Sequence, residues 1–160
     1  MTQIDHAATQ RDGVGPLVER AREAALRAYA PYSRFSVGCA VEAADGSIAV
    51  GSNMENACYR LGVCAEISAL AAASQRFGLE TIIRIAVSGG HVAKSGELAG
   101  TSLVTPCGGC RQSILEAAQL SGTDVEVISA NGEGSEVKVM RISELIPFGF
   151  GPANLEDARG

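Results

Sequence analysis

Residues 64–87 read CAEISALAAASQRFGLETIIRIAV, and this stretch decides the fold class. Its first part, 64–77, is rich in Ala and Leu, which favour helices, and Gly78 follows as a stop signal. We therefore predict a helix that begins at Cys64. Residues 81–87 (TIIRIAV) are a β-branched run of the kind found in buried strands. A helix that leads directly into a buried strand indicates an α/β domain.

Further helices and strands are expected on both sides of this stretch. Pro16 suits the first turn of a helix that Pro31 ends, and Asp45-Gly46 is typical of a hairpin turn. Asn131-Gly132 indicates a second turn. The expected elements are helix 14–30, strand 36–43, strand 47–51, loop 52–63, loop 88–105, helix 107–120, strand 124–130, strand 135–140 and helix 142–146. Strands that interleave with helices predict a layered α/β domain.

Composition excludes several classes of protein. With 160 residues, 46% hydrophobic and 19% charged, the chain has the length of one domain and enough apolar material to exclude disorder. No run of 18 apolar residues is present, so no membrane-spanning helix is expected. The 13 Lys and Arg against 18 Asp and Glu give a net charge of −5, which argues against polynucleotide binding.

The ends of the chain are expected to lie outside the folded domain. Residues 1–13 are polar and lack the basic start and apolar stretch of a signal peptide, so we predict a flexible N-terminus and a cytoplasmic protein. Residues 14–152 form the predicted single domain, and residues 153–160 form a C-terminal tail.

The five cysteines carry the chemistry of the sequence. Their odd number favours metal ligands, catalytic groups or core residues over disulfides in a reducing compartment. Cys107 and Cys110 form a C-x-x-C pair, and Cys64 is a candidate third ligand. Cys39 lies within a predicted strand and Cys58 in a loop, so both are poorer candidates. Three ligands leave one position of a tetrahedron open for water, as in catalytic zinc sites.

The ligand groups sit at predicted helix starts, where the helix dipole favours thiolates and lowers their pKa values. Glu66 follows Cys64 by two residues, so its carboxylate is placed to exchange a proton with a metal-bound water. C-A-E followed by P-C-x-x-C is the general signature of zinc deaminases.

Each residue also has a simpler interpretation. A C-x-x-C pair serves redox chemistry in thioredoxin-like proteins, an isolated Cys64 would be a core residue, and an isolated Glu66 a solvated acid at a helix start. The joint order and helix placement of these residues favour the metal site.

The chain resembles the small, homotetrameric cytidine deaminases. The motifs that carry the resemblance are APYSRFSVG (30–38), GSNMENACY (51–59), CAE (64–66), PCGGCRQ (106–112) and LIPFGF (145–150). The resemblance implies a three-layer α/β/α fold with a mixed five-stranded sheet. It also implies a zinc-dependent hydrolase that converts cytidine or deoxycytidine to uridine or deoxyuridine and ammonia, as in pyrimidine salvage.

The resemblance also implies residue roles. Cys64, Cys107 and Cys110 would bind zinc, and Glu66 would shuttle protons. The other implied roles are ribose binding by Asn53 and Glu55, stacking by Phe35, backbone contacts from Ala65 and Pro106, and reach into a neighbouring subunit's site by Tyr59 and Phe150. Asn53 and Glu55 lie two apart, so an extended segment would point both to one side.

The sequence departs from the family pattern at Ile67, where the family usually has an Arg that offsets the charge of three thiolates. Arg111 and Arg60 are candidates to approach the sulfurs instead. Blasticidin S deaminase also has an aliphatic residue after C-A-E, which keeps a modified cytosine nucleoside or an aminopyrimidine antibiotic open as an alternative substrate.

The loop 88–105 is a second departure, because it is longer than in ordinary members. We expect it to lie over the pocket and to alter substrate choice. His6 and His91 are the only histidines, and neither is an expected ligand. A structural zinc protein without activity and a polynucleotide editor are the other classes. Glu66 argues against the first and the acidic charge against the second.

Overall fold

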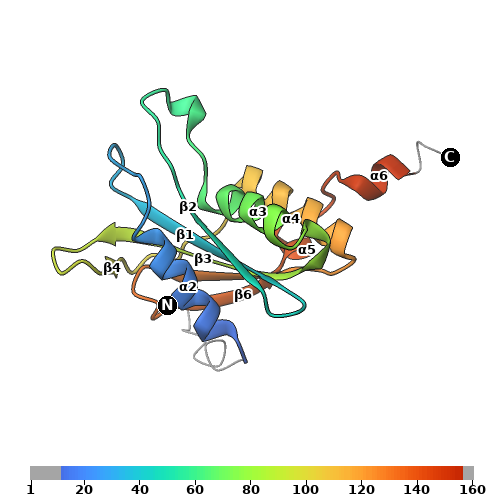
Figure 1. Ribbon diagram of the computed structural model, residues 1–160, viewed down its shortest axis with the longest axis horizontal. Coiled ribbons are helices and arrows are strands. Elements are labelled where there is room, and N and C mark those ends of the chain that lie inside the picture. Colours follow the sequence, from blue (N-terminus) through green and yellow to red (C-terminus); the bar gives the residue numbers. More distant parts are fainter. Residues whose placement is uncertain (1–11, 157–160) are drawn as a thin grey trace.

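A mixed sheet between two layers of helices forms the fold (Figure 1). The computed structural model describes residues 12–156. The strand order is β2 (Ile48–Ser52), β1 (Ser36–Ala43), β3 (Ile82–Val92), β5 (Glu126–Asn131) and β6 (Val137–Arg141). These are the five predicted strands, and a sixth short strand, β4 (Leu98–Ala99), pairs with β3. The β3–β5 pair is parallel, and the other pairs are antiparallel.

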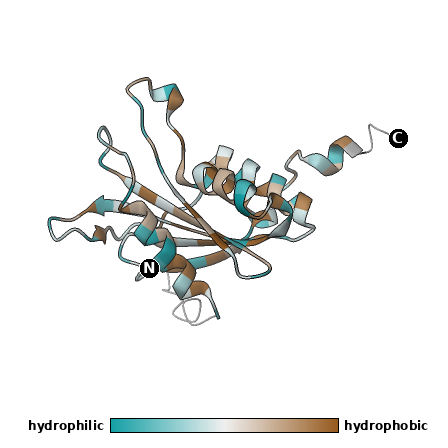
Figure 2. Cartoon of the chain, in the orientation of Figure 1, coloured by the Kyte–Doolittle hydropathy of each residue, from teal (hydrophilic) through white to brown (hydrophobic). Residues whose placement is uncertain are grey.

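Two apolar clusters hold the layers together. Helix α2 (Val14–Ala25) buries Leu17 and Ala21 against one face of the sheet, with Ala40 and Ile128 beneath them. On the other face lie α3 (Ala65–Arg76), α4 (Gly108–Ser121) and the short α5 (Ile142–Leu145). The central strands are covered on both sides and are mostly hydrophobic (Figure 2), as the burial of β1 and β3 requires. The three-layer α/β/α prediction is confirmed.

The first helix is shorter than the predicted 14–30, because α2 ends at Ala25. Beyond it, Tyr29 pairs with the segment after β2. Its N–H donates to the Asn53 carbonyl at 3.1 Å, and its own carbonyl accepts from the Glu55 N–H at 2.8 Å. These tertiary bonds take the main-chain groups that a longer helix would use, so the helix stops before Pro31.

The predicted loop 88–105 is wrong in part. Strand β3 continues to Val92, the chain turns through Gly96, and β4 returns along it with Leu98 opposite Val92. Glycines signalled a loop in the sequence, but here they permit close strand packing. A Cβ on Gly90 would lie 2.0 Å from the Ala99 carbonyl oxygen.

The remaining elements are short and lie in the predicted loop 52–63, between the predicted helix 64–77 and strand 81–87, and in the predicted tail. Short 3-10 turns cover Tyr59–Leu61 (η1) and Leu79–Thr81 (η2). Helix α6 (Pro152–Glu156) occupies part of the predicted tail and, in Figure 1, stands away from the body of the domain. We call residues 150–156 the C-terminal arm. Side chains of α4 hold it: Gln112 Nε2 donates to the Phe150 carbonyl at 2.6 Å, and Gln119 Oε1 accepts from the Ala153 N–H at 3.0 Å.

The terminal predictions fall largely outside the described residues. Of the N-terminal 1–13, only Asp12 and Gly13 are described, and His6 and residues 157–160 lie outside. Within 12–156, no helix has both the length and the apolar character needed to cross a bilayer.

Candidate active site

Three thiols meet at the starts of α3 and α4. The sulfurs of Cys64, Cys107 and Cys110 all lie within 4.8 Å of one another, and the Cys107 and Cys110 sulfurs are 3.4 Å apart. Among residues 12–156, this is the one group of three or more ligand-type side chains close enough to share a metal ion. Cys39 is buried in β1 and Cys58 is exposed, and neither belongs to the group.

Local structure explains this convergence. Cys64 is the N-cap of α3 and Cys107 the N-cap of α4, so both helices begin at the site. Cys110 lies in the first turn of α4 and is buried. Helix α3 packs closely on β2, where a Cβ on Gly51 would lie 2.3 Å from the Ala69 nitrogen. Each ligand is therefore fixed by a helix that is itself packed on the sheet.

Burial and helix geometry act differently on the three thiols. The Cys110 N–H donates to the Cys107 sulfur and lowers the pKa of that thiol. Burial raises the pKa of Cys64, and burial together with the Glu66 carboxylate raises the pKa of Cys110. The predicted lowering at helix starts therefore holds for Cys107, whereas desolvation outweighs it at the other two.

The sulfurs fit a zinc ion. Two thiols that resist ionisation in isolation become favourable thiolates beside a dication, which supplies the missing positive charge. A set of three sulfurs suits zinc rather than magnesium or calcium, and a fourth position remains for a small ligand.

Glu66 lies beside the thiols and is 4% exposed. It shares with Cys64 and Cys107 a cavity of about 310 Å³, the size of a small-molecule pocket. Within the described part of the chain its carboxylate makes no hydrogen bond or ion pair to protein groups. Burial and, to a lesser extent, the negative charge of Glu66 raise the pKa of Cys39, so the Cys39 thiol stays neutral. A buried, unpartnered carboxylate facing a cavity is equipped to exchange protons with a bound molecule.

Asn53 and Glu55 also line this cavity, and both already bind the protein. Asn53 Oδ1 accepts from the Val37 N–H at 2.8 Å, and its Nδ2 donates to the Phe35 carbonyl at 3.0 Å. Glu55 accepts from the main-chain N–H groups of Tyr32 and Ser33 at 2.9 and 3.2 Å and from the Ser33 hydroxyl. The two side chains thus fix the 30–37 segment, and each retains hydrogen-bonding capacity toward the cavity.

The other predicted contact residues differ in whether they line this cavity. Ala65 lines the same cavity, whereas Phe35 is 44% exposed and is not among the residues that line it. The Pro106 carbonyl accepts from Arg111 Nε at 2.8 Å, which leaves one lone pair on that oxygen. Tyr59 is 80% exposed and stacks edge-on against Tyr32, with ring centroids 5.9 Å apart.

The arginines predicted to approach the sulfurs do not bind them. Arg111 Nη1 donates to the Leu145 carbonyl at 3.1 Å, so its guanidinium is committed to main-chain oxygens. Arg60 is exposed. Ile67 faces the groove between α3 and α4 instead of the thiols. Phe150 is 62% exposed, and His91 is exposed on β3 away from the cavity.

Sequence reasoning did not assign a role to seven residues of the site. Ser33 anchors Glu55. The other six line the cavity: Val37, Met54, Gly62, Val63, Val104 and Thr105. The position of Thr105 next to Pro106 was the one signal that could have identified it. Ser33 lies within the motif APYSRFSVG, which by itself assigned no role to it, and Val104 lies in no motif.

Comparison with known proteins agrees with this geometry. The family described as "Cytidine and deoxycytidylate deaminase zinc-binding region" matches residues 15–121. A cytidine deaminase of Halalkalibacterium halodurans is 38% identical over 142 residues, which cover 88% of this chain and 96% of the relative. One from Mycobacterium tuberculosis is 34% identical over 139 residues, with 87% and 90% covered.

Solved structures agree as well. The cytidine deaminase of Burkholderia pseudomallei superposes with a TM-score of 0.71 at 38% identity and covers 85% of this chain and 98% of its own. That of M. tuberculosis gives 0.65 at 30% identity, with 86% and 96% covered. This chain therefore belongs to the zinc-binding cytidine and deoxycytidylate deaminase family.

Proposed function

We propose that this protein is a zinc-dependent cytidine deaminase, a hydrolase that converts cytidine or deoxycytidine and water to uridine or deoxyuridine and ammonia. The observation that carries the proposal is the cavity in which the Cys64 and Cys107 sulfurs and the buried Glu66 carboxylate meet. A structural zinc site would need no carboxylate beside its open position.

Each protein group has a defined task in this reaction. Zinc held by the three sulfurs would act as a Lewis acid that makes a water molecule more acidic. Glu66 accepts one proton from the attacking water and delivers it to N3 of the cytosine ring as the water oxygen bonds to C4. Glu66 then takes the second proton from the hydroxyl now on C4 and transfers it to the C4 amine, so that C4 becomes a carbonyl and the C–N bond breaks to release ammonia. Burial of Glu66 keeps competing water away from this proton transfer.

The substrate contacts are part of the proposal. The remaining acceptor and donor capacity of Glu55 and Asn53 suits the vicinal hydroxyls of a ribose. The free lone pair of the Pro106 carbonyl and the main chain of Ala65 would contact the base or its amine. Phe35 would stack near the pyrimidine from the edge of the cavity.

We infer a homotetramer for the active enzyme. Tyr59 and Phe150 are exposed to 80% and 62%, and Phe150 lies two residues before α6, the helix that stands away from the domain. Aromatic side chains in such positions suit contacts with a neighbouring subunit's site. Light scattering coupled to size exclusion should give four chains per particle, and a monodisperse monomer with full activity would disprove it.

We also propose a cytoplasmic location and a role in pyrimidine salvage. Five free thiols, three of them gathered as ligands, require a reducing compartment to remain available to a metal. The relatives are named cytidine deaminases, which does not favour the antibiotic-type alternative substrate.

An ammonia-release assay over cytosine nucleosides tests the activity. The zinc-loaded chain should deaminate cytidine and deoxycytidine, and Glu66→Gln should retain zinc while kcat falls by about 10²–10⁴, because the proton shuttle is lost but the ligands remain. A fully active Glu66→Gln protein would refute the mechanism. A zinc-loaded wild type that releases no ammonia from any nucleoside would refute the function.

A further inference from the structure

One side of the cavity is formed by the segment that begins with β4 and runs to Thr105. We call residues 98–105 the wall segment. It begins at Leu98, which is 4% exposed and serves as a buried anchor, and it ends with Val104 and Thr105 at the cavity. The next residues are Pro106 and the ligand Cys107, so any displacement of the wall segment reaches the site directly.

The wall segment is held by the end of β5 and by the turn that follows it. The Glu133 N–H donates to the Gly100 carbonyl at 3.2 Å, and the Val104 N–H donates to the Ala130 carbonyl at 3.3 Å. Asn131, which is 2% exposed, places its Nδ2 3.5 Å from the Thr101 carbonyl and 3.0 Å from the Ser135 hydroxyl. Main-chain groups of the wall segment are thus bound at three points.

Steric contact fixes the same position. A Cβ on Gly132 would lie 2.7 Å from both the carbonyl carbon and the oxygen of Ala99, and 3.0 Å from the Gly100 nitrogen. These are backbone atoms, so they cannot avoid the clash by a change of rotamer. The wall segment is seated where only a glycine fits beneath it.

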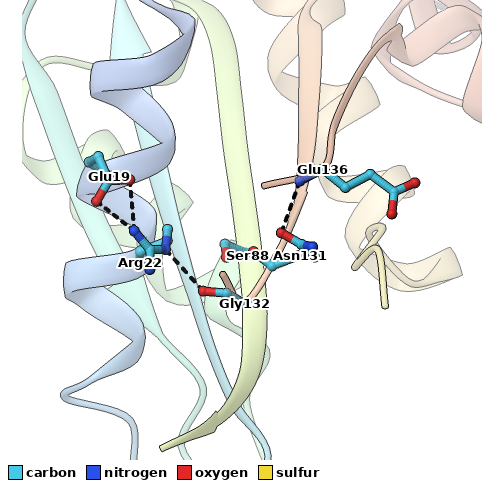
Figure 3. Close-up of polar contacts among 6 residues, drawn as sticks. All are labelled: Glu19, Arg22, Ser88, Asn131, Gly132 and Glu136. Atoms are coloured by element: carbon cyan, nitrogen blue, oxygen red, sulfur yellow. Dashed lines mark hydrogen bonds and ion pairs between the residues drawn. The ribbon is translucent and has the colours of Figure 1, made fainter. Parts of the chain in front are cut away.

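The turn is itself supported by helix α2 (Figure 3). Arg22 of α2 donates from Nε to the Gly132 carbonyl at 3.0 Å, while Glu19 accepts from its Nη1 at 2.8 Å. Asn131 Oδ1 accepts from the Glu136 N–H at 3.2 Å, and the Ser88 hydroxyl donates to the Asn131 carbonyl at 2.8 Å. A continuous set of contacts therefore runs from α2 through the turn to the cavity.

We propose that Asn131 and Gly132 are positioning residues that set the wall segment, and that the wall segment determines which cytosine nucleosides the cavity admits. This inference rests on the proposed deaminase function. Val104 and Thr105 line the cavity and precede the ligand Cys107 by three and two residues. The reacting C4 of the pyrimidine must lie near the ligands, so we expect the position of the wall segment to affect groups on the pyrimidine more than on the ribose.

Gly132→Ala is the direct test, because it displaces the wall segment without deleting a polar contact. Zinc content should stay at the wild-type level, KM for cytidine should rise about tenfold, and kcat should change by less than about twofold, since binding geometry is altered and the proton shuttle is not. The ratio of kcat/KM for 5-substituted cytidines to that for cytidine should shift by at least about threefold.

Lys94→Ala is the control. Lys94 is exposed in the turn between β3 and β4 and lies outside the wall segment, so losing its side chain should leave KM, kcat and the substrate ratio unchanged. If Gly132→Ala does not fold, Asn131→Asp replaces it. This variant keeps an acceptor for the Glu136 N–H but places an oxygen against the Thr101 carbonyl, and it should give the same shifts.

The outcomes separate the two proposals. A wild type that deaminates cytidine, together with a folded, zinc-loaded variant with unchanged KM and substrate ratio, would overturn the inference alone. If zinc content, kcat and thermal stability all fell together, the turn would have only a structural role, and the inference would also be overturned. A zinc-loaded wild type without deaminase activity would overturn the function and this inference together.

Discussion

Arg111 is adjacent to a metal ligand, yet its guanidinium binds the carbonyls of Pro106 and Leu145 and none of the sulfurs. The Pro106 carbonyl immediately precedes Cys107, so Arg111 fixes the main chain from which that ligand extends. The charge of the three thiolates is therefore not offset by a direct arginine contact within the described residues.

Arg111→Met should weaken zinc binding by about 10–100-fold, because outer contacts hold metal ligands in place. Competition between the protein and a chelator of known affinity measures the effect. Arg60→Met is the matched control, since Arg60 is exposed, and it should bind zinc like the wild type. Equal zinc affinity in Arg111→Met would show that α4 alone fixes Cys107.

Glu55 makes the stability of the loop at 30–35 depend on pH. The Ser33 hydroxyl and then the N–H groups of Tyr32 and Ser33 lower the pKa of its carboxyl below the usual 4.5. Because the pKa of Glu55 is lower in the folded state than in the unfolded state, its carboxylate stabilises the protein at any pH above the unfolded-state pKa. This contribution disappears as the pH falls through the folded-state pKa.

Glu55→Gln should therefore unfold more easily than the wild type at neutral pH, and the difference should shrink as the pH falls below 4.5, the ordinary pKa of a glutamate. Denaturant titrations across this range measure it, with the exposed Glu133→Gln as a control that shows no such trend. A difference that stays constant down to acid pH would rule out the carboxylate as its source.

At the scale of the elements, close contact between helices and strands depends on glycine. A Cβ on Gly38 would lie 1.9 Å from the Ala21 carbonyl oxygen of α2. Because that neighbour is helix backbone, α2 would have to move off β1 to make room.

Gly38→Ala should lower the free energy of unfolding by about 1–3 kcal/mol, the usual effect of overpacking, as measured by chemical denaturation. Gly109→Ala is the matched control. Its Cβ would meet no atom within 4 Å, so stability should be unchanged or slightly increased by the better helix propensity of Ala. Similar losses in both variants would mean that packing against α2 is not the cause.

The sequence predicted those elements whose signals are local. The starts of α3 and α4 follow from Cys64 and Cys107, and the three sulfurs with Glu66 were identified because two short motifs contain them all. The end of α2 and the extension of β3 depend on pairing with distant segments, such as Ser36 opposite Gly90. The wall segment lies within the predicted loop 88–105, which was expected to lie over the pocket, and Val104 and Thr105 do line the cavity. Its anchoring could not be predicted, since its contacts come from a turn thirty residues or so further along the chain.

At the scale of the whole molecule, the metal should contribute to folding as well as to chemistry. The three ligands come from the starts of two helices on one face of the sheet, so a bound ion would join segments that the chain connects through η2, β3 and β4. Binding to the folded state alone stabilises it by mass action.

Chelation of zinc should lower the thermal midpoint, and added zinc at about 100 times its Kd should restore about 2.7 kcal/mol of stability. Calorimetry of stripped and reloaded protein measures both. Magnesium should not replace zinc, because it prefers oxygen ligands. An unchanged midpoint after complete removal of the metal would mean that the folded thiol cluster needs no ion.

Helix α4 carries two of the sulfurs at one end and, along its side, Gln112 and Gln119, which grasp the protruding C-terminal arm. The same helix thus connects two of the proposed metal ligands to the C-terminal arm. In the proposed tetramer, a force on the arm from a neighbouring subunit, or from an affinity tag fused behind it, would act on α4, so we expect it to change the affinity for the metal.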